Sequence, residues 1–203
     1  MFGIPRKLFI ALVALLFVSI ILFISANFVL HQASEARFAG TLLDPPLAVQ
    51  DFELSGANGP VKRSDFQGKI VVLFFGYTSC PDVCPTTLAS LKKALQLLGD
   101  EAESVQVIMV AIDPERDTPD RVSQYVSGFN PSFVGLSGTL EQIAEVASRY
   151  GIYYARADST SDGGYLVDHT ATVSVLDREG RTRLLWSFGT TPEEMASDLR
   201  RLL

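Results

Sequence analysis

The chain has few of the residues that metal-storage or nucleic-acid-binding proteins need. It contains only two cysteines, and its three methionines are scattered along the sequence. A storage protein for soft metal ions needs many sulfur ligands, so this composition argues against storage. The net charge is −6, whereas a nucleic-acid-binding face has to be basic to neutralise phosphates. The sequence shows no internal repeat, and we expect one globular unit without a nucleic-acid partner.

A long apolar run near the N-terminus is the first feature that the sequence does contain. Residues 8–30 are apolar apart from two serines and one asparagine. As a helix they would span about 35 Å, enough to cross the hydrocarbon core of a bilayer. A cleaved signal peptide is the alternative, but its apolar region is usually only about 7–15 residues long. Because Arg6 and Lys7 precede the run, we expect a transmembrane anchor with residues 1–7 in the cytoplasm and the remaining chain outside.

The rest of the chain predicts a linker and one α/β domain. Residues 31–46 are small and polar without a regular period, which favours a linker, and residues 47–203 would form the domain. This domain would begin with a hairpin, followed by alternating strands and helices and a polar loop at 158–164. That order favours a thioredoxin-like fold, a central mixed sheet flanked by helices. The expected strands are 49–54, a short one near Val61, 70–75, 105–112, 167–177 and 183–186, and the expected helices are 84–98, 118–128, 140–150 and 191–203.

Both cysteines lie between a predicted buried strand and a predicted helix. Cys80 and Cys84 are separated by three residues, and Pro85 suits the first helical turn because it lacks an N–H that would be unpaired there. Asp113 follows the next strand. Because a right-handed crossover makes the two strands parallel neighbours, Cys80 and Asp113 are expected at one edge of the sheet.

Three interpretations of the two thiols are open from the residues alone. A structural disulfide across so short a loop would add only about 2 kcal/mol in the chain-entropy model. Redox exchange is favoured by the helix N-terminus, which lowers a thiol pKa, although thioredoxin-like exchangers normally have two residues between their cysteines. Metal binding would pair two thiolates, which select soft ions, with a third ligand that completes a trigonal site.

His169 is the candidate for that third ligand. A lone histidine in a strand is more often a structural residue, but His169 lies at the start of a predicted buried strand. Its neighbour Asp168 carries a carboxylate that could fix the imidazole tautomer. His31 borders the apolar run and is better explained as an interfacial residue. Two thiolates would give a Cu(I) site one net negative charge, and a helix N-terminus favours negative charge. Zinc usually needs a fourth ligand.

Three motifs resemble those of the Sco/SenC family. They are GYTSCPDVCP at residues 76–85, DPERDTP at 113–119 and VDHTA at 167–171. The motifs occur in the family's order and spacing, and the likeness covers roughly residues 46–203. The resemblance implies a thioredoxin-like domain behind a single membrane anchor, with a site that binds Cu(I) and Cu(II). In this chain Cys80, Cys84 and His169 would be the copper ligands.

The resemblance also implies a function in copper delivery. The family assists assembly of the binuclear copper centre of cytochrome c oxidase, so the expected partners are the copper-bearing oxidase subunit and other copper chaperones. Asp113 and Asp168 would lie near the site or face a partner, and a turn or helix-capping role is the alternative for Asp113. A metallochaperone is the favoured interpretation over an enzyme.

The same thiols would serve an alternative function, a thiol–disulfide oxidoreductase that reduces the cysteines of the oxidase subunit. Cys80 and Cys84 would then be the catalytic pair and would form a disulfide when oxidised. For the location, we expect a single-pass protein of the bacterial inner membrane with its soluble domain in the periplasm. The mitochondrial inner membrane, facing the intermembrane space, is the alternative, but no Arg- and Ser-rich transit segment precedes the anchor.

Overall fold

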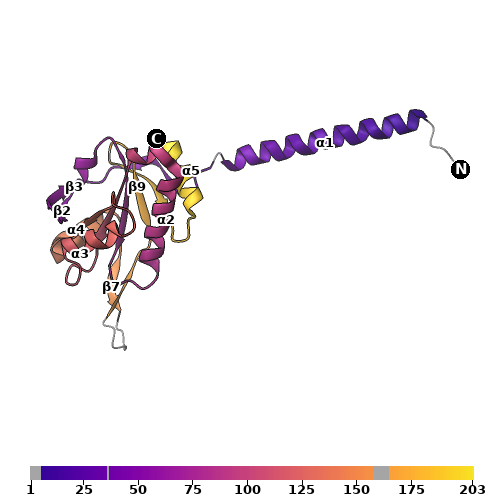
Figure 1. Ribbon diagram of the computed structural model, residues 1–203. Coiled ribbons are helices and arrows are strands. Elements are labelled where there is room, and N and C mark those ends of the chain that lie inside the picture. Colours follow the sequence, from indigo (N-terminus) through magenta and orange to yellow (C-terminus); the bar gives the residue numbers. More distant parts are fainter. Residues whose placement is uncertain (1–5, 36, 158–164) are drawn as a thin grey trace. The chain divides into compact units, whose positions relative to one another are not determined.

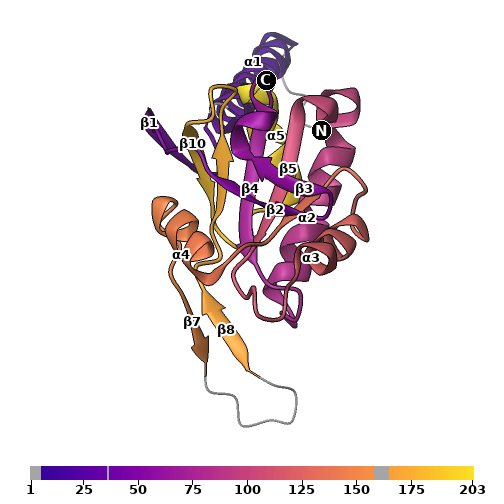
Figure 2. The same cartoon turned by 90° about the vertical axis from the view of Figure 1, so that its left-hand side faces the viewer.

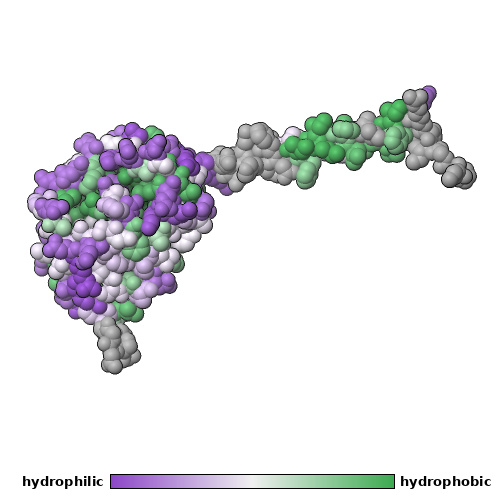
Figure 3. All heavy atoms as spheres, viewed as in Figure 1, coloured by the Kyte–Doolittle hydropathy of each residue, from purple (hydrophilic) through white to green (hydrophobic). Residues whose placement is uncertain are grey.

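The computed structural model describes residues 6–35, 37–157 and 165–203, which belong to two units, Met1–Phe38 and Ala39–Leu203. The first unit consists mainly of helix α1 (Arg6–Glu35), along which large apolar side chains such as Leu15 and Phe23 are exposed (Figure 3). Among the residues described, no helix combines the length and apolarity that a membrane crossing requires. Most of the predicted cytoplasmic segment and the loop expected at 158–164 lie outside the described residues.

The second unit is built on a six-stranded mixed sheet with the order β1-β10-β9-β4-β5-β6. Strands β4, β5 and β6 run parallel, while β9, β10 and β1 continue the sheet in antiparallel pairs. Every residue of β4 and β5 is buried, as their continuous apolar sequences predict for central strands covered on both faces. The six strands are β1 (Thr41–Leu47), β4 (Ile70–Gly76), β5 (Val105–Ala111), β6 (Val134–Leu136), β9 (Val173–Leu176) and β10 (Thr182–Trp186).

Helices cover both faces of this sheet, α2 and α5 on one side and α3 and α4 on the other (Figure 1). Helices α3, α4 and α5 begin with a threonine N-cap whose hydroxyl accepts a backbone N–H of the first turn, which satisfies donors that the helix leaves unpaired. The architecture confirms the expected α/β sheet flanked by helices. The helices are α2 (Val83–Leu98), α3 (Pro119–Ser127), α4 (Leu140–Arg149) and α5 (Pro192–Leu202), with short 3₁₀ segments at Arg63–Phe66 and Gly99–Ser104.

Two small hairpins lie outside the main sheet. Strands β2 (Glu53–Gly56) and β3 (Gly59–Lys62) form the opening hairpin that the sequence predicts, shifted a few residues along the chain. Strands β7 (Tyr154–Ala157) and β8 (Leu166–His169) pair with each other and extend away from the rest of the domain (Figure 2).

The predicted linker 31–46 is wrong, because α1 continues to Glu35 and Thr41–Leu47 forms strand β1 at the edge of the sheet. The buried Asp198 holds the beginning of this segment: its carboxylate accepts the backbone N–H groups of Ala39 and Gly40, each at 2.9 Å. The strand contains two prolines, which an edge position tolerates because one side of the strand needs no ladder hydrogen bonds. The compact domain therefore begins near residue 39.

The single strand predicted over 167–177 is also wrong, because the segment divides into β8 and β9. Thr170 closes the small hairpin: its N–H donates to the Tyr153 carbonyl at 2.9 Å, and its hydroxyl accepts the Tyr153 N–H at 3.1 Å. After this closure the chain joins the main sheet at Val173. His169 consequently lies at the end of a peripheral strand and not within a buried one.

Candidate metal centre

The two cysteines lie on the segment that connects β4 to α2. We call residues 77–84 the thiol loop. Cys80 is half-buried within it, and Cys84 is fully buried in the first turn of α2. The backbone N–H of Cys84 donates to Cys80 Sγ at 3.4 Å, which directs the first sulfur toward the helix N-terminus. Both sulfurs therefore belong to a segment that begins and ends in the hydrophobic core.

His169 reaches the thiols from the other side. It is the last residue of β8, and we call the β7–β8 pair the histidine hairpin. The ring Nε2 lies 3.6 Å from Cys84 Sγ. The ring Nδ1 lies 3.1 Å from the carbonyl oxygen of Thr170, which can only accept, so Nδ1 carries the hydrogen and Nε2 presents its lone pair to the thiols. The predicted tautomer partner, Asp168, is exposed, and the carbonyl takes that role because it is adjacent to the ring.

These three side chains form a compact ligand set. The sulfur atoms of Cys80 and Cys84 and a ring nitrogen of His169 all lie within 4.8 Å of one another. Two thiols and one imidazole suit a soft metal ion in a trigonal site. Among the described residues, no histidine, cysteine or carboxylate joins these three as a fourth ligand. A set of three donors suits copper(I) better than zinc, which usually takes four ligands in a tetrahedron. The structure thus brings together in space the three residues that the sequence predicts as ligands.

Burial controls the protonation of the inner sulfur. Burial raises the pKa of the Cys84 thiol well above its usual value, and the nearby Cys80 raises it further, while a backbone hydrogen bond at Tyr77 opposes this. At neutral pH the metal-free protein therefore holds Cys84 as a thiol. A metal ion that binds there has to displace its proton.

The space for this sulfur depends on a glycine. A Cβ atom at Gly76, the last residue of β4, would lie 2.9 Å from Cys84 Sγ and 2.8 Å from the Phe74 ring. Aromatic rings complete the wall: Phe74 and Tyr77 both meet the imidazole of His169 edge-on, at centroid distances of 6.4 and 6.1 Å. A pocket of about 230 Å³ opens beside Cys80 and His169. The site is closed on the core side and open through this pocket on the other.

The comparisons with known proteins agree with this site. A model of the SCO1/SenC family matches residues 41–203. The chain belongs to the SCO1/SenC family. Its relatives include an SCO2-like protein of Rickettsia conorii, 34% identical over 152 residues, which are 74% of each chain.

Solved structures of the SCO1/SenC family have the same fold. Apo Sco1 of Thermus thermophilus is 48% identical with a TM-score of 0.75, over 82% of this chain and 98% of that chain. Copper-bound ScoI of Bradyrhizobium japonicum is 42% identical with a TM-score of 0.70, over 76% of this chain and 99% of that chain.

Asp113 does not approach the ligand set of this SCO1/SenC member directly. It lies two residues beyond the end of β5, at the same sheet edge as the thiol loop, as predicted, because the Ile112 N–H donates to the Gly76 carbonyl at 2.9 Å. Its buried carboxylate accepts hydrogen bonds from Arg116 and from the Tyr165 hydroxyl.

Sequence reasoning missed Asp117, in the same DPERDTP motif. The Asp117 side chain is fully buried and accepts the backbone N–H of Thr78 at 2.8 Å and the Thr78 hydroxyl. The available signal was the second aspartate of the 113–119 motif, placed four residues after Asp113.

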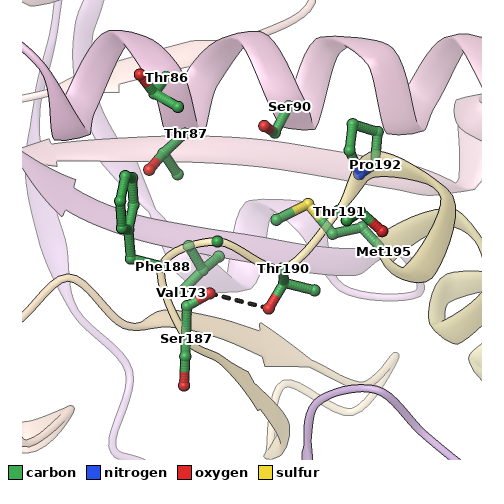
Figure 4. Close-up of a pocket in the computed structure, with 11 residues that line it drawn as sticks. Thr86, Thr87, Ser90, Val173, Ser187, Phe188, Thr190, Thr191, Pro192 and Met195 are labelled. Carbon is green, nitrogen blue, oxygen red and sulfur yellow. Dashed lines mark hydrogen bonds between the residues drawn. The ribbon is translucent and has the colours of Figure 1, made fainter.

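A second pocket, of about 250 Å³, lies between α2, α5 and the loop that follows β10 (Figure 4). Hydroxyl groups of serines and threonines line it, together with Phe188 and the thioether of Met195. Its lining contains no thiol, imidazole, carboxylate or amine, so it offers no acid, base or strong metal ligand. This pocket is therefore a weaker candidate for a metal site than the set of Cys80, Cys84 and His169.

Proposed function

We propose that this protein binds copper through Cys80, Cys84 and His169 and delivers it during assembly of the binuclear copper centre of cytochrome c oxidase. The observation that carries the proposal is the convergence of the three ligand atoms within 4.8 Å. Membership of the SCO1/SenC family supports it, as does the copper-bound structure of the Bradyrhizobium japonicum relative.

The site suits transfer of its cargo. Thiolates favour Cu(I), and the imidazole adds a ligand that Cu(II) also accepts. Because Cys80 is half-buried beside an open pocket while Cys84 is fully buried, an incoming ligand from a partner would reach the metal from the side of Cys80 and His169. Oxidation of the two thiols to a disulfide would remove two ligands and release the copper.

The partners and location follow from the family resemblance and from the N-terminal unit. The copper-bearing oxidase subunit would receive the metal, and another copper chaperone would supply it. The apolar run at residues 8–30 of the sequence supports a membrane anchor there, with residues 1–7 in the cytoplasm and the copper-binding domain in the bacterial periplasm. Asp168, exposed next to His169, would face the partner.

The test is an anaerobic copper titration of the full chain in detergent. We expect one copper ion per chain, and we expect His169→Ala to weaken binding and to change the Cu(II)–thiolate spectrum. His31→Ala, at the other histidine of the chain, is the matched control. Unaltered affinity and spectrum in His169→Ala would disprove the three-ligand site.

A second candidate function, reduction of the disulfide in the oxidase subunit, is favoured by the unequal burial of the cysteines. The half-buried Cys80 is accessible to a disulfide, and Cys84 lies close enough to resolve a mixed disulfide. Mixing the copper-loaded chain with the metal-free oxidase subunit separates the two functions. Copper transfer without a change in the subunit's thiols would indicate a chaperone, and loss of a subunit disulfide would indicate a reductase.

A further inference from the structure

One short segment contacts both halves of the candidate copper site. It runs from Asp113 to Asp117, separated from the end of β5 by the single residue Ile112, and we call it the carboxylate loop. Its two aspartates are 4% and 0% exposed, yet their carboxylates point to different partners. Buried carboxylates are costly unless they are fully hydrogen-bonded, so each pair of contacts is expected to be well defined.

Asp117 fastens the thiol loop. One carboxylate oxygen accepts the Thr78 N–H at 2.8 Å and the other accepts the Thr78 hydroxyl, two residues before Cys80. Arg121 adds to this contact, because its Nε donates to the Thr78 hydroxyl oxygen at 2.9 Å and lies 3.6 Å from the Asp117 carboxylate. The backbone of Asp117 is itself held, since its carbonyl accepts the buried Ser137 hydroxyl at 2.6 Å.

Asp113 fastens the histidine hairpin. Its carboxylate accepts the Tyr165 hydroxyl at 2.7 Å and the Arg116 guanidinium, and Arg116 donates in turn to the Tyr165 carbonyl at 2.9 Å. The guanidinium also stacks on the Tyr165 ring, 3.8 Å from its centroid. Tyr165 immediately precedes β8, the strand that ends in His169.

The histidine hairpin needs such a contact more than a strand of the main sheet does. Within the described residues, β7 and β8 pair with each other and with no strand of the six-stranded sheet. An isolated two-stranded hairpin is only marginally stable in water. Its position relative to the thiol loop is therefore set by side-chain contacts, and those of Tyr165 with the carboxylate loop are half-buried.

We propose that the carboxylate loop is a positioning element that sets the distance between the two thiols and His169, with Asp117 holding the thiol loop and Asp113 holding the histidine hairpin. The two aspartates do not bind the metal; they act on its ligands. The expected effect on copper binding rests on the proposed function. The expected effect on the positions of the thiol loop and the histidine hairpin applies to the metal-free protein as well.

The test compares Asp113→Asn with Asp117→Asn in the full chain, with the exposed Asp120→Asn, on the same segment of the chain, as matched control. In the metal-free protein, amide hydrogen exchange should rise about tenfold in Val167–Thr170 for Asp113→Asn and in residues 77–84 for Asp117→Asn, as expected for loss of one hydrogen bond. Tyr165→Phe and Thr78→Val delete the hydroxyl part of these contacts from the other side and replace any aspartate variant that fails to fold.

Copper binding should also distinguish the Asp113 variants from the Asp117 variants. In Asp113→Asn and Tyr165→Phe the Cu(II) spectrum should move toward that of His169→Ala, and copper affinity should fall by roughly 10–100-fold. In Asp117→Asn and Thr78→Val the affinity should fall while the imidazole contribution to the spectrum persists. Asp120→Asn should match the wild type in both readouts.

Two outcomes would overturn the positioning role. Either all four variants accelerate exchange equally in both segments, which indicates general destabilisation, or none changes exchange or spectrum. If the wild type fails to bind copper but the two segments still loosen separately, the proposed function is wrong and the positioning role stands.

Discussion

The thiol loop and the histidine hairpin contribute to one site but are held in place by different forces. The thiol loop connects β4, in which every residue is buried, with α2, whose inward face is also buried. The histidine hairpin lies outside the main sheet, and its residue Leu166 is 43% exposed. One half of the site is positioned by the hydrophobic core and the other by hydrogen bonds and stacked side chains.

This difference gives the two halves different stabilities and different roles. Core burial contributes about 25 cal/mol per Å² and cannot be removed without unfolding, so the thiols keep their position as long as the domain is folded. Hydrogen bonds contribute only about 0.5–1.5 kcal/mol each, so the hairpin can open while the domain stays folded. In the proposed function, such a site would hold copper at the two sulfurs while the imidazole moves with the hairpin.

The largest effect is expected from removing the buried sulfur. Cys84→Ser should reduce Cu(I) affinity by more than the roughly hundredfold that loss of an outer-sphere partner costs, because it deletes a ligand from the rigid half. Competition with a chromophoric Cu(I) chelator measures the change, and thermal unfolding of the metal-free variant shows that the fold persists. His169→Ala should lose less Cu(I) affinity than Cys84→Ser, and the reverse order would contradict the assignment of the thiol loop as the stable half.

The pH dependence of Cu(I) binding should depend on the Cys84 sulfur. Burial raises the pKa of the Cys84 thiol, so at neutral pH the metal-free protein holds a proton that the copper complex lacks. Cu(I) affinity should therefore rise with pH, by about tenfold per pH unit for this proton. Titrations between about pH 6 and 8, corrected for the chelator's own protonation, measure the slope. In Cys84→Ser this proton is no longer displaced, so Cu(I) affinity should rise less steeply with pH, by about tenfold less per pH unit. An unchanged slope would mean that Cys84 binds copper as a pre-formed thiolate.

The sequence predicted the core-held half of the site better than the other half. The strand expected at 70–75 and the helix expected at 84–98 match β4 and α2 to within one residue at each end, because an unbroken apolar run and a proline are strong local signals. Around His169 the prediction failed, since the residues at 170–172 include no glycine or proline to mark the break between β8 and β9. Tertiary contacts, not local propensity, decide that the chain changes sheets there.

The roles of the aspartates were likewise beyond sequence reasoning. Asp168 was expected to orient the imidazole, but the carbonyl of Thr170 does so, and a backbone group leaves no trace in the sequence. Asp117 was not singled out although it lies in a recognised motif, because its partner Thr78 is 39 residues away in the chain. The three candidate ligands could be singled out from the sequence because cysteine and histidine are rare in this chain.

An intermediate effect is expected at the glycine beside the buried sulfur. Gly76→Ala would place a methyl group 2.9 Å from Cys84 Sγ, so the sulfur or the Phe74 ring has to shift. We expect a destabilisation of about 1–3 kcal/mol, as for other overpacked cores. Copper affinity should fall by about tenfold, because the displaced sulfur is part of the half that the core holds. Calorimetry and chelator competition measure the two changes.

Gly128→Ala is the matched control for that substitution. Gly128 has a φ of −62°, so alanine fits its backbone, and the nearest atom to a new Cβ is the Tyr125 carbonyl oxygen at 3.3 Å. Copper affinity should be unchanged in this variant. If Gly76→Ala bound copper as tightly as the wild type, the packing around Cys84 would not determine the position of its sulfur.

The smallest effect is expected from an exposed contact of the histidine hairpin. Glu115, in the carboxylate loop, forms an ion pair with Arg156 of β7, but both side chains are about half exposed, at 48% and 52%. Exposed ion pairs contribute little because solvent screens them, so Glu115→Gln should change copper affinity by less than about fivefold, and less still in high salt. Chelator competition at low and high ionic strength measures this against Asp113→Asn. A loss as large as that of Asp113→Asn would mean that the hairpin is held by its surface charges and not by the buried carboxylate.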